Sequence, residues 1–220
     1  MSLSIPTARI AGAVLFFATL PARGEPPGSG EAVSVVAAPG AALELDGDSS
    51  LHRYSAKAQG MGVDVGLDAA WVASASAAPD VEALIRGRFI RTFQLTVPVG
   101  KLSSGERGLD ERMRKALKGN QYREIRFRMD SYDVAAPPAS GVTLAVTLHG
   151  RLSLAGVERR IDVAAAGVWV KGGVRFTGSK DLLMTDYGVK PPTLVFGAIK
   201  TENLVTVKFD VTLQLGRKPK

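Results

Sequence analysis

Apolar and polar side chains alternate along most of the chain after residue 41. In residues 142–154 valine and leucine at every second position alternate with threonine, alanine and histidine, and residues 203–215 repeat this pattern. A period of two indicates antiparallel β-strands that have one apolar and one polar face. We expect further strands at residues 42–46, 51–59, 63–71, 81–97, 125–130, 159–170 and 174–179.

One segment departs from this alternation. Residues 103–119 carry Leu109, Met113 and Leu117 at helical spacing, with acidic residues near the start, basic residues near the end and Gly119 as a stop signal. They predict one short inserted α-helix. Together with about eight long strands, the pattern predicts an all-β fold in which an antiparallel sheet closes into a long-stranded barrel.

The N-terminus has the pattern of an export signal. A short segment that ends in Arg9 precedes eleven uncharged, mostly apolar residues at 10–20, and small residues follow at 22 and 24. We therefore expect a cleaved signal peptide at 1–24, because a transmembrane helix needs about 20 apolar residues. Residues 25–41 are rich in Pro, Gly and Ala and predict a flexible leader. The barrel domain is then expected at 42–216 and a basic tail at 217–220.

Composition narrows the class of protein. The 220 residues are 45% hydrophobic and 22% charged, which is typical of a globular protein, and the absence of cysteine excludes disulfides and thiolate metal sites. The net charge of +7 raises the question of nucleic-acid binding. The basic residues between 112 and 128 have only Tyr122 as a nearby aromatic, however, and base stacking needs exposed aromatics. We therefore expect no nucleic-acid partner; the cluster is a solvated face or contacts an anionic membrane surface.

Four segments together resemble the YceI-like family of mostly exported bacterial proteins: residues 46–55, 95–127, 150–157 and 178–201. The last of these contains Met184-Thr-Asp-Tyr-Gly-Val-Lys-Pro-Pro192. The chain departs from the family pattern at Arg123, where a proline is usual, and at Arg53-Tyr54. The resemblance implies an extended lipocalin-like antiparallel β-barrel that encloses a long apolar tunnel. It also implies a polyisoprenoid lipid or an isoprenoid quinone as the ligand.

The apolar face of the predicted strands supplies the candidate tunnel lining. The expected lining residues are Ile85, Phe89, Phe93, Phe127, Met129, Leu144, Val146, Leu148, Val207 and Phe209. The tunnel entrance is expected at the inserted helix and the loop after Gly178, with side chains from Leu109, Met113, Leu117, Met184, Tyr187 and Phe196. As an alternative, these two elements form a structural plug.

Arg91 is the candidate head-group ligand, because it lies between Phe89 and Phe93 on the apolar phase of a predicted strand. In the alternative interpretation, a β-bulge turns Arg91 outward. Asp110 is expected to stabilise the start of the helix. The two histidines, His52 and His149, have no acid or nucleophile at the spacing of a catalytic triad. We therefore expect no catalytic residue, no metal site and no cofactor other than a bound isoprenoid lipid.

These observations favour an exported protein, periplasmic or secreted, that carries or stores a long isoprenoid lipid without catalysis. Two alternatives stay open. One is a stress-related structural or interaction protein whose barrel is filled by its own side chains, and the other is a hydrolase or isomerase that uses the same pocket. The sequence leaves both monomer and homodimer open.

Overall fold

The computed structural model describes residues 32–74, 80–135, 144–194 and 199–218, and the features below are those of these residues. Every described element belongs to one compact unit, Glu31–Lys220. Twelve strands can be assigned within it: β1 (Ala32–Ala37), β2 (Ala42–Ser49), β3 (Tyr54–Ala58), β4 (Gly62–Leu67), β5 (Ile90–Pro98), β6 (Leu102–Ser103), β7 (Glu124–Ala135), β8 (Leu144–Leu154), β9 (Val157–Val170), β10 (Gly173–Leu183), β11 (Thr193–Leu194) and β12 (Ile199–Lys218).

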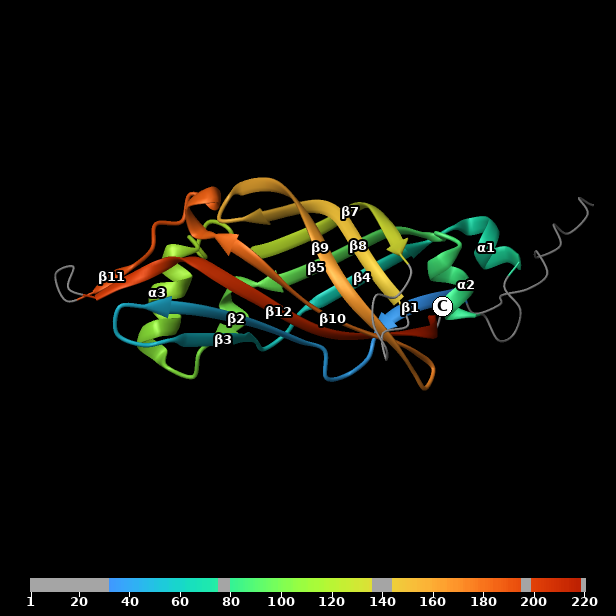
Figure 1. The fold of residues 1–220 in the computed structure, drawn as a ribbon, viewed down its shortest axis with the longest axis horizontal. Coiled ribbons are helices and arrows are strands. Elements are labelled where there is room, and N and C mark those ends of the chain that lie inside the picture. Colours follow the sequence, from blue (N-terminus) through green and yellow to red (C-terminus); the bar gives the residue numbers. More distant parts are fainter. Residues whose placement is uncertain (1–31, 75–79, 136–143, 195–198, 219–220) are drawn as a thin grey trace, which may run out of the picture. The chain divides into compact units, whose positions relative to one another are not determined.

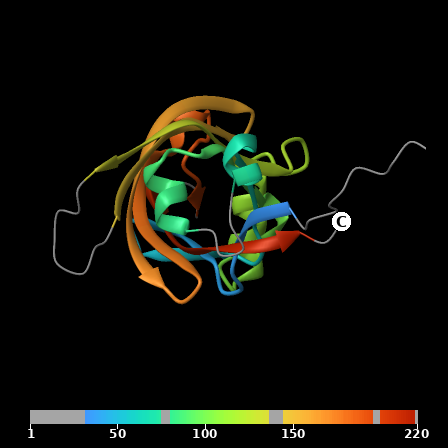
Figure 2. The ribbon, with the colours of Figure 1, turned by 90° about the vertical axis from the view of Figure 1, so that its right-hand side faces the viewer.

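The strands form one antiparallel sheet that curls round an apolar interior (Figures 1 and 2). Its order is β4-β5-β7-β8-β9-β10-β12-β2-β3-β6, with β1 and β11 also paired to β12. The fold is thus all-β and lipocalin-like, as predicted. The described residues show no ladder between β4 and β6, so this curled sheet is a half-barrel rather than the fully closed barrel that we expected.

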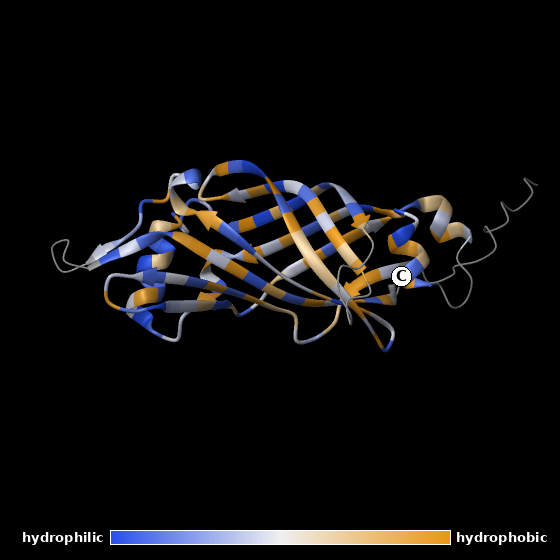
Figure 3. Ribbon diagram, in the orientation of Figure 1, coloured by the Kyte–Doolittle hydropathy of each residue, from blue (hydrophilic) through white to orange (hydrophobic). Residues whose placement is uncertain are grey.

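The predicted alternation is visible along the strands as apolar and polar bands (Figure 3). In β8, Leu144, Val146, Gly150 and Leu152 are buried, while the residues at the odd-numbered positions are more exposed. A bulge at Asp130 of β7 shifts the register, so that Met129 pairs with Gly150 and Ser131 with His149. The inward phase of β7 therefore changes from odd to even positions after the bulge, and Tyr132 joins Met129 in the core.

A tight turn joins β8 to β9 through Ala155 and Gly156. Both residues have positive φ, 51° and 87° respectively. Two consecutive left-handed residues match the twist of the flanking strands, and glycine adopts this conformation without steric cost.

Three α-helices occur in the described residues, where one was expected: α1 (Ala69–Ser74), α2 (Val81–Arg86) and α3 (Arg107–Ala116). Short 3₁₀ turns form η1 (Val99–Lys101) and η2 (Met184–Tyr187). Helix α3 is the predicted helix and lies at one end of the curled sheet, whereas α1 and α2 lie at the opposite end (Figure 1). No helix among the described elements is long and apolar enough to cross a lipid bilayer.

The prediction of a strand over residues 81–97 is wrong for its first part. Residues 81–86 form α2, because the Asp80 carboxylate accepts a 2.8 Å hydrogen bond from the backbone N–H of Glu82 and so caps the helix. Glu82 also pairs with Arg86 one turn later, at 2.7 Å. Similarly, the strand expected at 63–71 ends at Leu67, and Trp71 lies in α1.

Part of the expected flexible leader is ordered. Residues 32–37 form β1, which pairs with β12 in a register that places Val35 opposite Leu215. Val35 is 8% exposed and belongs to the hydrophobic core. The sheet therefore begins about ten residues earlier than the predicted boundary at residue 42, and it extends to Lys218, into the segment expected to be a basic tail. Residues 1–31, which include the predicted signal peptide, lie outside the described residues.

Candidate functional site

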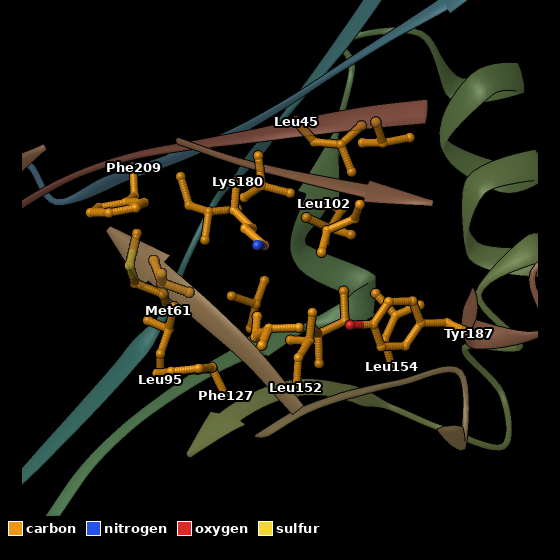
Figure 4. Close-up of a pocket in the computed structure, with 18 of the residues that line it drawn as sticks. Leu45, Met61, Leu95, Leu102, Phe127, Leu152, Leu154, Lys180, Tyr187 and Phe209 are labelled. Carbon is orange, nitrogen blue, oxygen red and sulfur yellow. The ribbon is translucent and has the colours of Figure 1, made fainter. Parts of the chain in front are cut away.

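The concave face of the curled sheet encloses a cavity of about 390 Å³. Strands β2, β5, β7, β8, β9, β10 and β12 all contribute inward side chains, so residues far apart in the sequence meet around one space (Figure 4). A volume in this range is typical of pockets that enclose a small organic ligand. The interior is therefore not filled by the protein's own side chains.

Eight of the predicted lining residues do line this cavity: Ile85, Phe93, Phe127, Met129, Val146, Leu148, Val207 and Phe209. The other two lie elsewhere. Phe89 stacks on Trp71 of α1, with ring centroids 6.1 Å apart. Leu144 is completely buried in the packed core and does not reach the cavity.

The aromatic side chain of Phe209 lies over a glycine on the neighbouring strand. Phe209 of β12 pairs with Gly178 of β10, and a Cβ atom at Gly178 would come within 2.4 Å of the ring. Glycine at this position therefore lets the ring lie close against the sheet, which widens the space in front of it.

The predicted entrance residues meet at the α3 end of the cavity. Leu109, Met113 and Leu117 come from α3 and its C-terminal turn, and Met184 and Tyr187 come from η2. All five line the cavity. Phe196, the sixth predicted entrance residue, lies outside the described residues.

Arg91 does not face the cavity, so its predicted role as an inward head-group ligand is wrong. Between β4 and β5, Gly66 pairs with Thr92 but Leu67 pairs with Ile90, which leaves Arg91 as the extra residue of a bulge. Its side chain is 62% exposed, and its Nη2 atom lies 2.6 Å from Asp68 Oδ2. Hydrogen bonds from Arg91, and then from the Trp71 backbone, hold the pKa of Asp68 below its usual value. The alternative that we considered, an outward bulge, is the observed one.

Asp110 supports the start of α3 from within its first turn rather than as the N-cap, which is Glu106. Its carboxylate accepts hydrogen bonds from the backbone N–H of Ser104 at 2.6 Å and from the hydroxyls of Ser104 and Ser103 at 2.7 and 3.0 Å. These bonds, chiefly that from the Ser104 backbone, lower the pKa of Asp110. They fix the loop before α3 and thereby the position of that helix at the end of the cavity.

Several cavity residues were not predicted, although the same alternation could have found most of them. They include Leu43, Leu45, Met61, Leu95, Leu152, Ile161, Val163, Phe176 and Leu182. Lys180 of β10 was not predicted either, and it differs from the others because it is a charged residue that lines the cavity. The strand expected at 174–179 ended one residue before it.

Few polar groups reach the cavity. The ring of Tyr187 is buried, which raises the pKa of its hydroxyl, and Tyr54 has its pKa raised by burial and by nearby Asp48. His52, Glu106 and Arg112 border the cavity, but all three are exposed residues. Within the described part of the chain, no acidic side chain pairs with the His52 ring, and no group of three or more His, Asp or Glu side chains could hold a metal ion.

His149 lies on the outer face of the sheet. Its Nδ1 atom is 2.7 Å from Asp162 Oδ1 and its Nε2 atom is 3.1 Å from Asp133 Oδ2. The ring thus links β7 and β9 across β8, on the side opposite the cavity. This placement agrees with its position on the polar phase of the predicted strand.

Comparison with known proteins identifies the fold. A search of the curated proteins finds no match. Among solved structures, the Burkholderia cenocepacia protein BcnA superposes with a TM-score of 0.58 at 12% identity, covering 78% of this chain and 95% of that one. A polyisoprenoid-binding domain from Saccharophagus degradans superposes with a TM-score of 0.55 at 13% identity, covering 85% of this chain and all of the domain.

A mutant of a Campylobacter jejuni YceI protein is also similar, with a TM-score of 0.51 and 12% identity over 75% of this chain and 85% of that one. At these identities the likeness establishes the fold alone. The sequence itself matches the model of the YceI-like domain over residues 50–213, three quarters of its length. On the strength of this match, the chain belongs to the YceI-like family.

Proposed function

We propose that this protein is an exported binding protein that holds a long isoprenoid lipid, of polyisoprenoid or quinone type, in the cavity of its curled sheet, without catalysing a reaction. The observation that carries this proposal is the apolar cavity inside the curled sheet. Valine, leucine, isoleucine, methionine and phenylalanine from seven strands face a space of about 390 Å³.

The energetics of such a site are sufficient for binding. Each CH₂ group removed from water contributes about 0.8 kcal/mol, so a few five-carbon units offset the cost of association. The polyisoprenoid-binding domain from Saccharophagus degradans has the same fold. This likeness supports the ligand class, and the apolar lining of the present cavity is compatible with it.

The two alternatives from the sequence are less well supported. A structural protein with a filled interior does not need a cavity of this size. A hydrolase or isomerase needs a nucleophile, a base and an orienting group within hydrogen-bond reach of each other. In the described residues, the polar groups that border the cavity are instead scattered over β2, β3, β7, β10, β12, α3, η2 and the loop that carries His52. The Ser49 hydroxyl bonds to the backbone of His52 rather than to its ring.

We also propose that the lipid enters at the α3 end, where Leu109 and Met113 line the cavity beside the exposed basic residues Arg112 and Lys115. Positive charge around an apolar opening suits an anionic membrane surface as the source of the lipid. Export to the periplasm or beyond rests on the signal-like residues 1–24, and cleavage near residue 24 can be checked by N-terminal sequencing of the mature protein.

The proposed function is tested by mass spectrometry of organic extracts from protein purified from its native host. A stoichiometric isoprenoid would support it, and a protein that carries no lipid and binds no added isoprenoid would refute it. Two matched variants place the ligand in the cavity. Ala165 lines the cavity, whereas its neighbour Ala164 is exposed on the outer face. Ala165→Leu should weaken binding of farnesol, a neutral isoprenoid alcohol, and Ala164→Leu should not.

A further inference from the structure

Lys180 lies on the inward-facing side of β10, where the alternation along the strand places apolar side chains. Phe176 and Leu182, on the same phase of the strand, line the cavity together with Lys180. The residues between them, such as Ser179 and Asp181, are exposed on the outer face. Lys180 is therefore a cationic side chain on the inner face of the sheet. Figure 4 shows its nitrogen directed into the cavity.

The Lys180 ammonium group has no counter-ion among the described residues. Two lysines on the outer strand faces differ in this respect: Lys208 lies 2.6 Å from Asp46, and Lys57 lies 3.9 Å from Glu44. Glu106 also borders the cavity, but it is exposed at the start of α3 and makes no ion pair with Lys180. The cavity thus contains an unneutralised positive charge.

A charged group surrounded by apolar side chains is costly unless an opposite charge or a hydrogen-bond acceptor accompanies it. Leu45, Leu102 and Leu152, which line the same cavity (Figure 4), offer neither. An anion that enters the cavity would supply both, and an ammonium–carboxylate or ammonium–phosphate contact is a strong, charge-assisted hydrogen bond.

We propose that Lys180 binds the anionic head group, a carboxylate or a phosphate, of the lipid held in the cavity. This inference rests on the proposed function and narrows its ligand to acidic lipids with one apolar chain. Tyr187 supplies a second donor, because its ring is buried while its hydroxyl points into the cavity and makes no hydrogen bond to a described residue (Figure 4).

The position of Lys180 along β10 also orients the ligand. Lys180 is three residues before the end of the strand at Leu183, after which η2 and the α3 end of the cavity follow. Phe176, four residues back, is roughly 13 Å deeper at the usual rise of a strand. The head group would thus lie near the α3 end, and the apolar chain would extend past Phe209 and Phe176 towards Ile85 of α2.

The test compares three ligands that share a fifteen-carbon isoprenoid chain: farnesol, farnesoic acid and farnesyl monophosphate. Binding to the full chain is measured by isothermal titration calorimetry. We expect at least one of the two anions to bind about tenfold more tightly than the alcohol or better, the size of effect that a hydrogen bond to a charged group supports. The tighter of the two anions identifies the head group as carboxylate or phosphate.

Lys180→Met keeps the length of the side chain and removes its charge. It should abolish the preference for anions, measured as the ratio of the dissociation constants of farnesol and of each anion, while Lys180→Arg should retain the preference. Lys171→Met is the matched control, because Lys171 is exposed in the turn before β10 and its loss changes the net charge equally. The melting temperature of each variant reports whether it is folded.

The results of these binding measurements distinguish failure of the role of Lys180 from failure of the proposed function. If farnesol binds but neither anion is preferred, or if the preference survives Lys180→Met, the role of Lys180 is refuted and the apolar binding function stands. A preference that disappears instead in Arg112→Met would place the anion at the α3 surface and would also refute it. If none of the three ligands binds, both proposals fail.

Discussion

The hydroxyl of Tyr132 donates a 3.0 Å hydrogen bond to the backbone carbonyl oxygen of Ile85. Tyr132 belongs to β7 and Ile85 to α2, and both side chains line the cavity. Burial raises the pKa of the Tyr132 hydroxyl, which therefore stays protonated and able to donate. This single bond ties the short helix to the sheet at the end of the cavity opposite α3.

Tyr132→Phe should lower the free energy of unfolding by about 0.5–1.5 kcal/mol, because it removes one buried hydrogen bond and retains the ring. It should also speed the escape of a bound neutral isoprenoid, since α2 is held less firmly. Urea denaturation and a ligand-release assay measure the two effects. Tyr122→Phe is the control, because the Tyr122 hydroxyl makes no hydrogen bond to a described residue; equal losses in both variants would contradict the role of the Tyr132 bond.

Phe209→Ala should destabilise the ligand-free protein less than a truncation in the packed core. Truncation of a buried phenylalanine typically lowers the free energy of unfolding by about 3–5 kcal/mol. Phe209 borders an existing cavity, so we expect about half of that loss. Leu144 is 0% exposed and away from the cavity, and Leu144→Ala should cost about 2–5 kcal/mol. Only Phe209→Ala should reduce isoprenoid retention. A Phe209 variant with normal retention would show that its ring does not contact the ligand.

Met113→Glu tests whether α3 forms the entrance of the cavity or a structural plug. The new carboxylate would stand where an apolar chain has to pass, and its desolvation would slow farnesol loading, by about tenfold if Met113 lies on the route. The melting temperature should change far less. Lys115→Glu, on the exposed side of α3, is the control. A Met113 variant that loads at the normal rate, or one that does not fold, would instead indicate that α3 is a structural plug.

A chain that begins at Ala41 should be less stable than one that begins at Glu31, which retains β1. The shorter chain loses the pairing of residues 32–37 with β12 and the burial of Val35. Burial of one valine alone contributes about 1.5–3 kcal/mol. Calorimetric melting compares the two chains, and identical melting temperatures would mean that β1 adds no stability to the sheet.

The contribution of His149 to stability should depend on pH. Hydrogen bonds from its ring to Asp162 and then Asp133 raise its pKa above the ordinary 6.5. A raised pKa in the folded state means that the stabilisation is complete below the pKa of the unfolded chain and is lost as the pH rises through the higher, folded value. His149→Gln should therefore lower the melting temperature more at about pH 5.5 than at about pH 8.5. Equal losses of melting temperature at the two pH values would contradict this prediction.

Much of this fold and most of the cavity lining follow from local information. A strand alternates its side chains every second residue, so the positions of Leu148 and Phe209 on the inner face could be predicted without knowing their neighbours. Prediction from alternation fails where a β-bulge shifts the register between two strands. Arg91 has the inward parity, but the bulge opposite Gly66 and Leu67 turns it outward, and a bulge depends on the partner strand.

Helix α2 was missed for a different reason. Val81–Arg86 spans less than two turns, and apolar residues over so short a stretch fit a strand or a helix equally well. The features that favour a helix are Asp80 at its start and the Glu82–Arg86 pair one turn apart. The sequence does not show that Asp80 caps the helix; the hydrogen bond from the Glu82 backbone does. The cavity volume could not be predicted either, because it depends on how rings such as Phe209 settle against glycines on adjacent strands.

Strand β12 is the last strand of the chain and pairs with β1, β2, β10 and β11. Strands β7 to β10 can pair as successive neighbours soon after synthesis, but β2 reaches the rest of the sheet only through β12, as in the pairing of Leu43 with Phe209. Until residues 199–218 have emerged, β1 and the β2–β3 pair have no partner in the rest of the sheet, and the apolar concave face stays open to water. Contacts so distant in sequence form slowly. We therefore expect assembly to wait for β12, with a period during which the unfinished sheet needs a chaperone, or its lipid, to cover that face.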